Sequence, residues 1–392
     1  MKSLNAHFRK VYGEGGEIRS FFSPGRVNLI GEHTDYNGGH VFPCSLSIGT
    51  YAVARKREDS FVRFYSMNFE DQGVITVDLK ELIYDEKDDW ANYPKGVVSI
   101  MKESGYAVSG FDVLYYGNIP NGAGLSSSAS IELATAVLLN ELNDLHLEMV
   151  EMVKMSQRAE NEFVGVNCGI MDQFAIGMGK EDAAVLLDCN TLEYTYSPVV
   201  LENASLVISN TNKRRGLADS KYNERRSECE RALRQLQEHL QIESLGDLTV
   251  ETFEANKQHI TNPIDQKRAK HAVYENVRTI EAAKRLKAGE FDAFGQLMNE
   301  SHVSLRDDYE VTGLELDALV EAAWAEEGVI GSRMTGAGFG GCTISIVENQ
   351  FLDSFQTNVA KTYKEKTGLT PEFYVVEIGA GAREINQLSE AL

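Results

Sequence analysis

The chain has 392 residues, of which 43% are hydrophobic, and this length predicts two domains because it exceeds what one hydrophobic core usually supports. The formal net charge of −21 argues against nucleic acid or an anionic membrane as a partner. The five cysteines are scattered and form no C-x-x-C pair, which predicts reduced thiols in a cytoplasmic protein and no zinc site. No stretch has the length and apolar character of a signal peptide or a membrane span.

The first part of the chain is rich in strand patterns. We expect a short amphipathic helix within residues 1–20, a strand near residues 19–22 and a turn at Pro24-Gly25. Further strands are expected at residues 48–54 and 61–66, because apolar and aromatic residues alternate there with polar ones.

Residues 31–40 form a dense polar segment, the polar loop. It follows the apolar residues 27–30 and carries Glu32, His33, Thr34 and Asp35 in a row before a glycine turn. Carboxylates accept hydroxyl protons, and imidazole and hydroxyl groups donate or accept, so this set suits a polyhydroxylated ligand. The alternative is a solvated polar turn, and the segment by itself leaves both interpretations open.

A second polar segment, the serine-rich loop at residues 120–130, follows an acidic loop at 85–90, a helix ending near Met101 and a strand at 111–116. Residues 131–139 are good helix formers, so the loop joins a strand to a helix N-terminus. Such an end offers unpaired N–H groups and a partial positive charge, which favour a phosphate. Gly122 and Gly124 allow the backbone to approach a bulky anion, and the serines offer hydroxyls to phosphate or Mg²⁺.

The serine-rich loop differs from two familiar phosphate loops. A Walker A loop would end in Gly-Lys-Ser/Thr, whereas Leu125 follows the last glycine here, and the third glycine of the dinucleotide fingerprint is missing. The alternative is a serine cap that only starts a core helix. Capping needs one side-chain oxygen and the sequence offers Ser126, Ser127 and Ser128, so we favour phosphate binding.

A helical pattern over residues 147–163 ends with Glu160, and a glycine-punctuated loop over 165–174 carries Asp172. Glu160 is the carboxylate expected to share Mg²⁺ with Ser128, because such sites use one or two carboxylates plus phosphate oxygens. Asp172 lies among apolar residues, so it is either desolvated and paired or a helix cap. An arginine such as Arg26 beside it would keep it ionised.

The second half is expected to be largely helical. Strands are expected at 183–187 and 206–208. We place a domain boundary between them, near residue 200, which gives domains of 1–200 and 201–392. A long helix follows with Tyr222 near its start, then helical stretches at 265–300, 313–326 and 352–366, and a strand at 373–378. The glycine-rich loop, 335–342, precedes a strand, so we expect either a backbone brace beside the site or a tight turn.

Residues 24–39, 122–130, 169–173 and 336–341 together resemble the small-molecule kinase superfamily that includes galactokinase, homoserine kinase, mevalonate kinase and phosphomevalonate kinase. The first of these blocks is similar to the galactokinase signature. The resemblance implies an α+β fold with mixed sheets and helices in two domains and an active site in the cleft between them. It implies ATP-dependent phosphorylation of the anomeric hydroxyl of α-D-galactose, the first committed step of galactose catabolism.

The resemblance also assigns roles to residues. Glu32, His33, Asp35 and Tyr222, with Thr34 in the same loop, would hold the sugar. The nucleotide would contact Ser66 near its adenine end and Gly122, Ala123, Gly124, Leu125, Ser126, Ser127 and Ser128 at its phosphates. Ser128 and Glu160 would hold Mg²⁺. Asp172 would take the hydroxyl proton or only orient the hydroxyl, and Arg26 would stabilise the transition state.

Two other interpretations stay open. One is a kinase of the same fold that acts on N-acetylgalactosamine, and another is an inactive sugar sensor that binds galactose and ATP. A third, a dinucleotide-dependent oxidoreductase, fails because its glycine fingerprint is missing. We expect galactose as the partner, without nucleic acid or membrane, and a cytoplasmic monomer.

Overall fold

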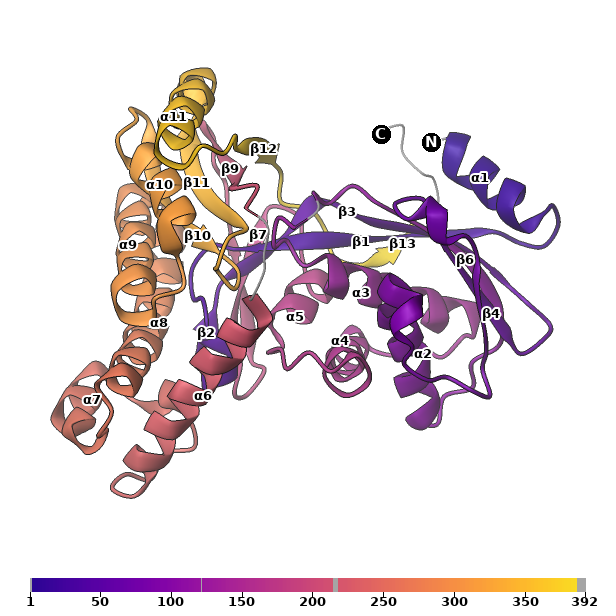
Figure 1. Cartoon of the computed structure of the whole chain (residues 1–392), viewed down its shortest axis with the longest axis horizontal. Coiled ribbons are helices and arrows are strands. Elements are labelled where there is room, and N and C mark those ends of the chain that lie inside the picture. The colour runs from indigo at the N-terminus through magenta and orange to yellow at the C-terminus, as the bar shows by residue number, and fades with distance from the viewer. Residues whose placement is uncertain (1, 121, 214–217, 386–392) are drawn as a thin grey trace.

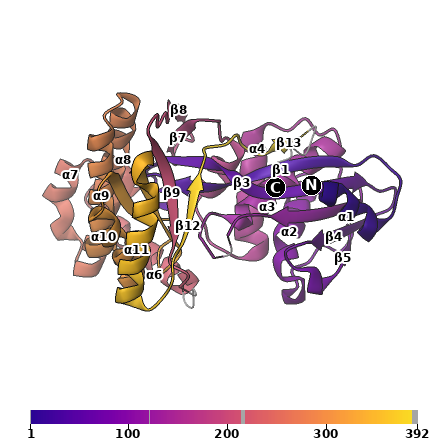
Figure 2. The ribbon, with the colours of Figure 1, turned by 90° about the horizontal axis from the view of Figure 1, so that it is seen from above.

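The structure is a computed structural model that describes residues 2–120, 122–213 and 218–385. The described residues form two parts, each with its own sheet and helices, and Figure 1 shows them side by side along the long axis. In the view from above, β9 and β12 lie between the N-terminal sheet and the C-terminal helices (Figure 2). The predicted α+β class with two domains and mixed sheets is confirmed.

The first part is built on a six-stranded sheet of order β13-β1-β3-β6-β4-β5, in which only β4 and β6 run parallel. Alternation along β3 separates two cores: Ala52 and Ala54 face helices α2 to α5, and Val53 faces helix α1. The elements are α1 (Lys2–Tyr12), β1 (Arg19–Asn28), β3 (Pro43–Lys56), β4 (Phe61–Ser66), β5 (Ile75–Asp78), α2 (Asn92–Glu103), β6 (Phe111–Gly117), α3 (Ser127–Leu142), α4 (Met149–Arg158), α5 (Met171–Gly177) and β13 (Arg383–Glu384).

The turn predicted at Pro24-Gly25 is wrong, because both residues lie inside β1. The pairing of β1 with β3 is irregular here, because Pro24 faces Gly49 and Arg26 faces Ser45, so Gly25 alone stands opposite residues 46–48 of β3. The extra residues, and so the bulge, belong to β3. At Gly49, where the irregular stretch begins, a Cβ atom would lie 2.1 Å from the carbonyl oxygen of Ser23. A glycine at this position of β3 therefore lets the two backbones approach, and β1 continues toward the polar loop.

The second part combines a four-stranded antiparallel sheet, β10-β11-β9-β12, with a stack of helices. The helix predicted over 265–300 is two helices, because the chain turns at Gly289 with a φ of +73°. The elements are β9 (Ala204–Asn210), α6 (Ala218–Gln237), α7 (Val250–Asn256), α8 (Pro263–Lys287), α9 (Phe291–Ser304), α10 (Gly313–Trp324), β10 (Val329–Thr335), β11 (Cys342–Glu348), α11 (Leu352–Thr367) and β12 (Glu372–Val376), with a small sheet of β2 (His40–Val41), β7 (Ala183–Asp188) and β8 (Tyr194–Pro198).

One hydrophobic core spans both parts. It contains Leu29 from the end of β1 together with Ile208, Phe294 and Ile344 from the second part. The chain also returns to the first sheet at its end, where β13 pairs with β1. The boundary near residue 200 stays a prediction. Among the described residues, no helix has both the length and the apolar character needed to cross a membrane.

Candidate functional site

A cavity of about 360 Å³ lies where the polar loop, the serine-rich loop and the glycine-rich loop meet. Most of the site residues predicted from the sequence line it. They are Arg26, Glu32, His33, Asp35, Gly122, Ala123, Gly124, Leu125, Ser126, Ser127, Ser128, Glu160, Asp172 and Tyr222. Segments from both halves of the sequence therefore build one cleft.

At the centre of the cavity, Asp172 forms a two-pronged ion pair with Arg26. Asp172 stands in the first turn of α5, and its two oxygens accept from Nε and Nη2 of Arg26 at 2.7 and 2.8 Å. The hydroxyl of Ser126 donates to the same carboxylate, and Nη1 of Arg26 donates to the Gly124 carbonyl at 2.8 Å. The pairing expected from the sequence is confirmed, and it joins the carboxylate to the serine-rich loop.

The serine-rich loop, described except for Asn121, leads into α3 through backbone of unusual conformation. Gly122, Gly124 and Ser126 have φ values of 70°, 73° and 62°. Ser126 occupies the cap position of α3 but makes no side-chain capping bond, because its hydroxyl is directed to Asp172. The first N–H groups of a helix lack partners within it, so they remain available at this end of the cavity. The serines here do more than start a helix.

Glu160 also lines the cavity, and it stands in a π-helical turn (Ala159–Val164) that follows α4. The pKa of Glu160 is raised to about 7, mainly by burial and also by the charge of Asp172, while a hydrogen bond from Ser128 works in the opposite direction. Gln173 donates to Glu160 at 2.6 Å and to the fully buried Glu132 at 3.1 Å. One oxygen of Glu132 has no hydrogen-bond partner. The negative charge gathered here suits a cation.

Glu32 is the most enclosed carboxylate of the polar loop, with 1% of its surface exposed. Its oxygens accept from the side-chain amide of Asn28 and from the backbone N–H of Gly336 in the glycine-rich loop. The glycine-rich loop therefore acts as the brace that one of the two sequence interpretations expected. Burial raises the pKa of Glu32, although Arg333 opposes this effect.

His33 belongs to a cluster of aromatic rings. Its Nε2 donates to the carbonyl of Ala337 at 3.1 Å, and its Nδ1 accepts from the hydroxyl of Tyr36 at 2.8 Å. The ring centroids of Tyr222 and Tyr309 lie 5.6 and 4.8 Å from that of His33. Burial lowers the pKa of His33 to about 3, so the ring is neutral. Both ring nitrogens are engaged, and the cluster gives the cavity a rigid wall.

Asp35 and Thr34 follow His33 but face different surroundings. Burial, together with the charge of Asp172, raises the pKa of Asp35 to about 7. Its carboxylate lies against Gly169, where an added Cβ atom would stand 1.9 Å from Oδ2. Thr34 is fully buried, and its hydroxyl contacts the carbonyls of Gly31 at 2.9 Å and His40 at 2.6 Å. Thr34 thus holds the shape of the loop and does not line the cavity.

Ser66 stands apart from the other predicted site residues. It ends β4, and its hydroxyl accepts from the N–H of Asn68 at 3.2 Å. It is 4% exposed and is not among the residues that line the cavity.

The sequence reasoning missed several residues in and around the site. Glu132 carried a signal, since it is a charged residue within the apolar run of α3. Gly169 was part of a noted loop, but its contact with Asp35 joins residues far apart in sequence. Other wall residues outside the predicted set include Tyr93, Cys168, Met171 and Ala337.

Three family models match the chain. The model described as the galactokinase galactose-binding signature matches residues 6–56. The GHMP kinases N terminal domain matches residues 92–180, and the GHMP kinases C terminal model matches residues 280–365. These ranges contain the polar loop, the serine-rich loop and the glycine-rich loop, respectively.

Known proteins are similar over nearly the whole chain. Galactokinase of Fusobacterium nucleatum is 62% identical over 98% of this chain and 100% of that protein. Galactokinase of Bacillus subtilis is 58% identical over 98% of this chain and 99% of its own length. The crystal structure of Lactococcus lactis galactokinase complexed with galactose superposes with a TM-score of 0.96 at 50% identity, covering 98% of this chain and 99% of the other. The chain therefore belongs to the galactokinase family of the GHMP kinases.

Proposed function

We propose that this protein transfers the terminal phosphoryl group of ATP to the anomeric hydroxyl of α-D-galactose, giving galactose 1-phosphate and ADP. The observation that carries the proposal is that Asp172, paired with Arg26, the serine-rich loop and the polar loop all line one cavity. Phosphoryl transfer depends mainly on positioning and charge neutralisation, and the cleft supplies groups for both.

In this reaction Asp172 accepts the proton of the anomeric hydroxyl as the oxygen bonds to phosphorus and ADP leaves. Its two-pronged ion pair with Arg26 holds the carboxylate in one orientation. Arg26 also touches the serine-rich loop through Gly124, so its positive charge lies between the carboxylate and the expected phosphates. Glu32, Asp35 and Tyr222 face the cavity and hold the sugar hydroxyls, while His33 supports the wall.

Mg²⁺ supplies charge neutralisation for the triphosphate, and Ser128 and Glu160 would hold it. No three acidic, histidine or cysteine side chains of the described residues gather as a complete metal site. Mg²⁺ often uses one or two carboxylates with phosphate oxygens and water, so a hydroxyl and a carboxylate suffice. The fit rests on Glu160, which lines the cavity beside Ser128, and on the buried oxygen of Glu132 that has no hydrogen-bond partner.

A sugar panel with an ADP readout tests the proposed function. We expect ADP formation with galactose, ATP and Mg²⁺, and none when a chelator removes the metal. Glucose should react poorly, because an unmatched hydroxyl leaves buried polar groups unpaired at a cost of ~1–3 kcal/mol per group. Faster turnover of N-acetylgalactosamine would reassign the substrate. Sugar binding without any ADP would instead indicate a sensor.

We also propose a cytoplasmic monomer. All five cysteines are free thiols, as expected in a reducing compartment. Gel filtration with light scattering would check the monomer, and a mass of twice 43.5 kDa would contradict it.

A further inference from the structure

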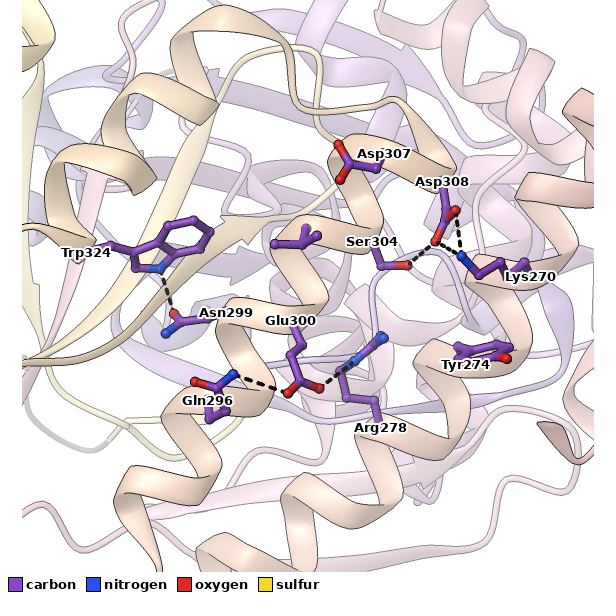
Figure 3. Close-up of a pocket in the computed structure, with 11 residues that line it drawn as sticks. Lys270, Tyr274, Arg278, Gln296, Asn299, Glu300, Ser304, Asp307, Asp308 and Trp324 are labelled. Atoms are coloured by element: carbon purple, nitrogen blue, oxygen red, sulfur yellow. Dashed lines mark hydrogen bonds and ion pairs between the residues drawn. The ribbon is translucent and has the colours of Figure 1, made fainter.

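A buried group of charged side chains joins the second part of the molecule to the backbone that enters the polar loop. Arg333 of β10 and Glu275 of α8 are both fully buried, with Nη2 and Oε1 3.9 Å apart. The mechanism proposed above uses neither residue. Figure 3 shows Arg278, which pairs with Glu275, projecting from α8, and Ser304 on α9.

Arg333 contacts the segment just before the polar loop. Its Nη1 donates to the carbonyls of Asn28 at 3.1 Å and Leu29 at 3.2 Å. The same nitrogen lies 3.6 Å from the Glu32 carboxylate. One guanidinium therefore holds the backbone of two residues and faces the charged group that we place at the sugar.

Glu275 holds Gly31, two residues beyond Leu29. Its Oε1 accepts from the backbone N–H of Gly31 at 3.1 Å and from the hydroxyl of Ser301. Ser301 in turn accepts from Nε of Arg333 at 3.2 Å, so it links the two charged groups. Although burial alone would raise it, the pKa of Glu275 is held at about 2, chiefly by the charges of Arg278, His271 and Arg333. Glu275 is therefore an anion at any working pH.

The outer end of the group opens on a cavity of about 540 Å³ between α8, α9 and Trp324 (Figure 3). The polar side chains drawn there contact one another, since Lys270 pairs with Asp308 at 3.0 Å and the amide of Gln296 donates to Glu300 at 3.3 Å. The contacts of Arg333 and Glu275 with the backbone that enters the polar loop are therefore the ones whose function remains to be explained.

Burying an ion pair is a weak way to stabilise a fold, because the desolvation cost offsets the attraction. A pair whose hydrogen bonds end on the carbonyls of residues 28 and 29 and the N–H of residue 31 instead restricts where that backbone lies. Preorganised binding groups lose less entropy when a ligand binds. The effect of this group should therefore appear mainly in the affinity for the ligand of the polar loop.

We propose that Arg333, Glu275 and Ser301 are positioning residues that fix the backbone of residues 28–32 and so aim Glu32 at the sugar. This inference rests on the proposed function, because it takes galactose as the ligand of Glu32. The three residues act through the loop and do not touch the substrate.

The mildest test is Ser301→Ala, with Ser332→Ala as the matched control. Both serines are fully buried, but Ser332 bonds only to Ser345 across β10 and β11, at 2.8 Å, through its hydroxyl. We expect Ser301→Ala to weaken galactose binding about 10-fold by calorimetry, since hydrogen bonds to charged groups are lost. The KM for ATP should change less than about twofold because the serine-rich loop is not touched. Ser332→Ala should match the wild type.

Two further measurements separate a positioning role from a general loss of stability. Arg333→Lys should bind galactose more tightly than Arg333→Met, because lysine restores the charge without the two-pronged geometry. Amide hydrogen exchange of residues 28–33, measured without ligands, should be faster in Ser301→Ala than in Ser332→Ala. Equal exchange in these two variants, or an unchanged galactose affinity in a folded Arg333→Met variant, would overturn the inference. A wild type that binds no galactose would overturn the proposed function, and the exchange comparison would still report on the loop.

Discussion

Asp172 shows how individual residues in this site are placed by their partners. Its two oxygens accept hydrogen bonds from Arg26, and Ser126 of the serine-rich loop donates a further one. The carboxylate is still 28% exposed, so a hydroxyl can reach it from the cavity. This geometry supports a group that is held in one orientation and remains accessible to substrate.

The first prediction concerns this carboxylate. Asp172→Asn keeps the shape but removes the charge and the proton acceptor, so turnover should fall by at least ~100-fold. Galactose affinity, measured by calorimetry, should change little because Glu32 and Asp35 remain. Near-normal turnover in the variant would remove Asp172 from the chemical step.

The second prediction concerns Asp35 and pH. Its pKa is about 7 in the folded protein and about 4 in an unfolded chain, so folding takes up a proton between these values. Because the folded pKa is the higher one, Asp35 makes the ligand-free protein less stable as pH rises from about 4 to about 7. Above about pH 7 its contribution to the free energy of unfolding no longer changes with pH.

Asp35→Asn should remove this contribution. Between pH 5 and pH 8 the free energy of unfolding should fall by ~1–2 kcal/mol more in the wild type than in the variant, allowing for solvent screening. Urea unfolding at both pH values measures the difference. The same pH dependence in both proteins would show that Asp35 titrates normally.

At the scale of elements, β1 supports two loops at once. Beside its irregular pairing with β3 it touches the serine-rich loop, where the N–H of Arg26 donates to the Leu125 carbonyl at 3.1 Å, and its end leads into the polar loop. A Cβ atom at Gly25 would stand 2.9 Å from that carbonyl oxygen. One strand therefore contacts the serine-rich loop and leads into the polar loop.

The third prediction tests this contact with Gly25→Ala. The methyl group should displace the serine-rich loop, and we expect the KM for ATP to rise about 10-fold while galactose affinity stays within about threefold. Gly117→Ala is the control, because its added Cβ would approach nothing nearer than 3.7 Å. An unchanged KM for ATP in Gly25→Ala would show that the contact between Gly25 and Leu125 does not fix the position of the serine-rich loop.

The whole molecule is joined by the core that spans both parts. Phe294 is fully buried in that core, and its ring meets Phe42 of the first part at 6.5 Å between centroids. The cleft depends on this contact region, because residues from both parts line it. We therefore expect the two parts to unfold together.

The fourth prediction uses the two tryptophans as reporters, Trp90 in the first core and Trp324 in α10. Phe294→Ala should destabilise the protein by ~3–5 kcal/mol, as do other large deletions in cores. Urea unfolding followed by each tryptophan separately, in Trp90→Phe and Trp324→Phe backgrounds, should show the same loss. A shift seen only by Trp324 would mean that the parts unfold independently.

Local patterns predicted much of this molecule. The serine-rich loop was predicted between a strand and a helix, and it joins β6 to α3. The polar loop and Asp172 were likewise recognised from residues that are neighbours in sequence. Such features depend on backbone geometry and helix ends within a few residues, so short windows contain the information.

Other features were wrong or unseen because distant partners create them. Pro24-Gly25 by itself has the pattern of a turn, but its pairing with β3, in which Pro24 faces Gly49, keeps it inside a strand. The strand β13 contains only Arg383 and Glu384 and exists because β1 offers an open edge, where Arg19 pairs with Glu384 at 2.6 Å. Strand pairing and burial overrode the local propensity in both places.

The sequence by itself determined the family and most residues of the cleft, because short motifs carry both, and the resemblance to the family implied the α+β class. Only the tertiary structure decided which charged groups are buried and what they face. Arg333 reaches Asn28 across 305 residues of sequence, and no local pattern reports such a contact. Burial in a common interior brings these groups together, and hydrogen bonds such as those from Arg333 to the carbonyls of Asn28 and Leu29 offset part of the cost of burying them.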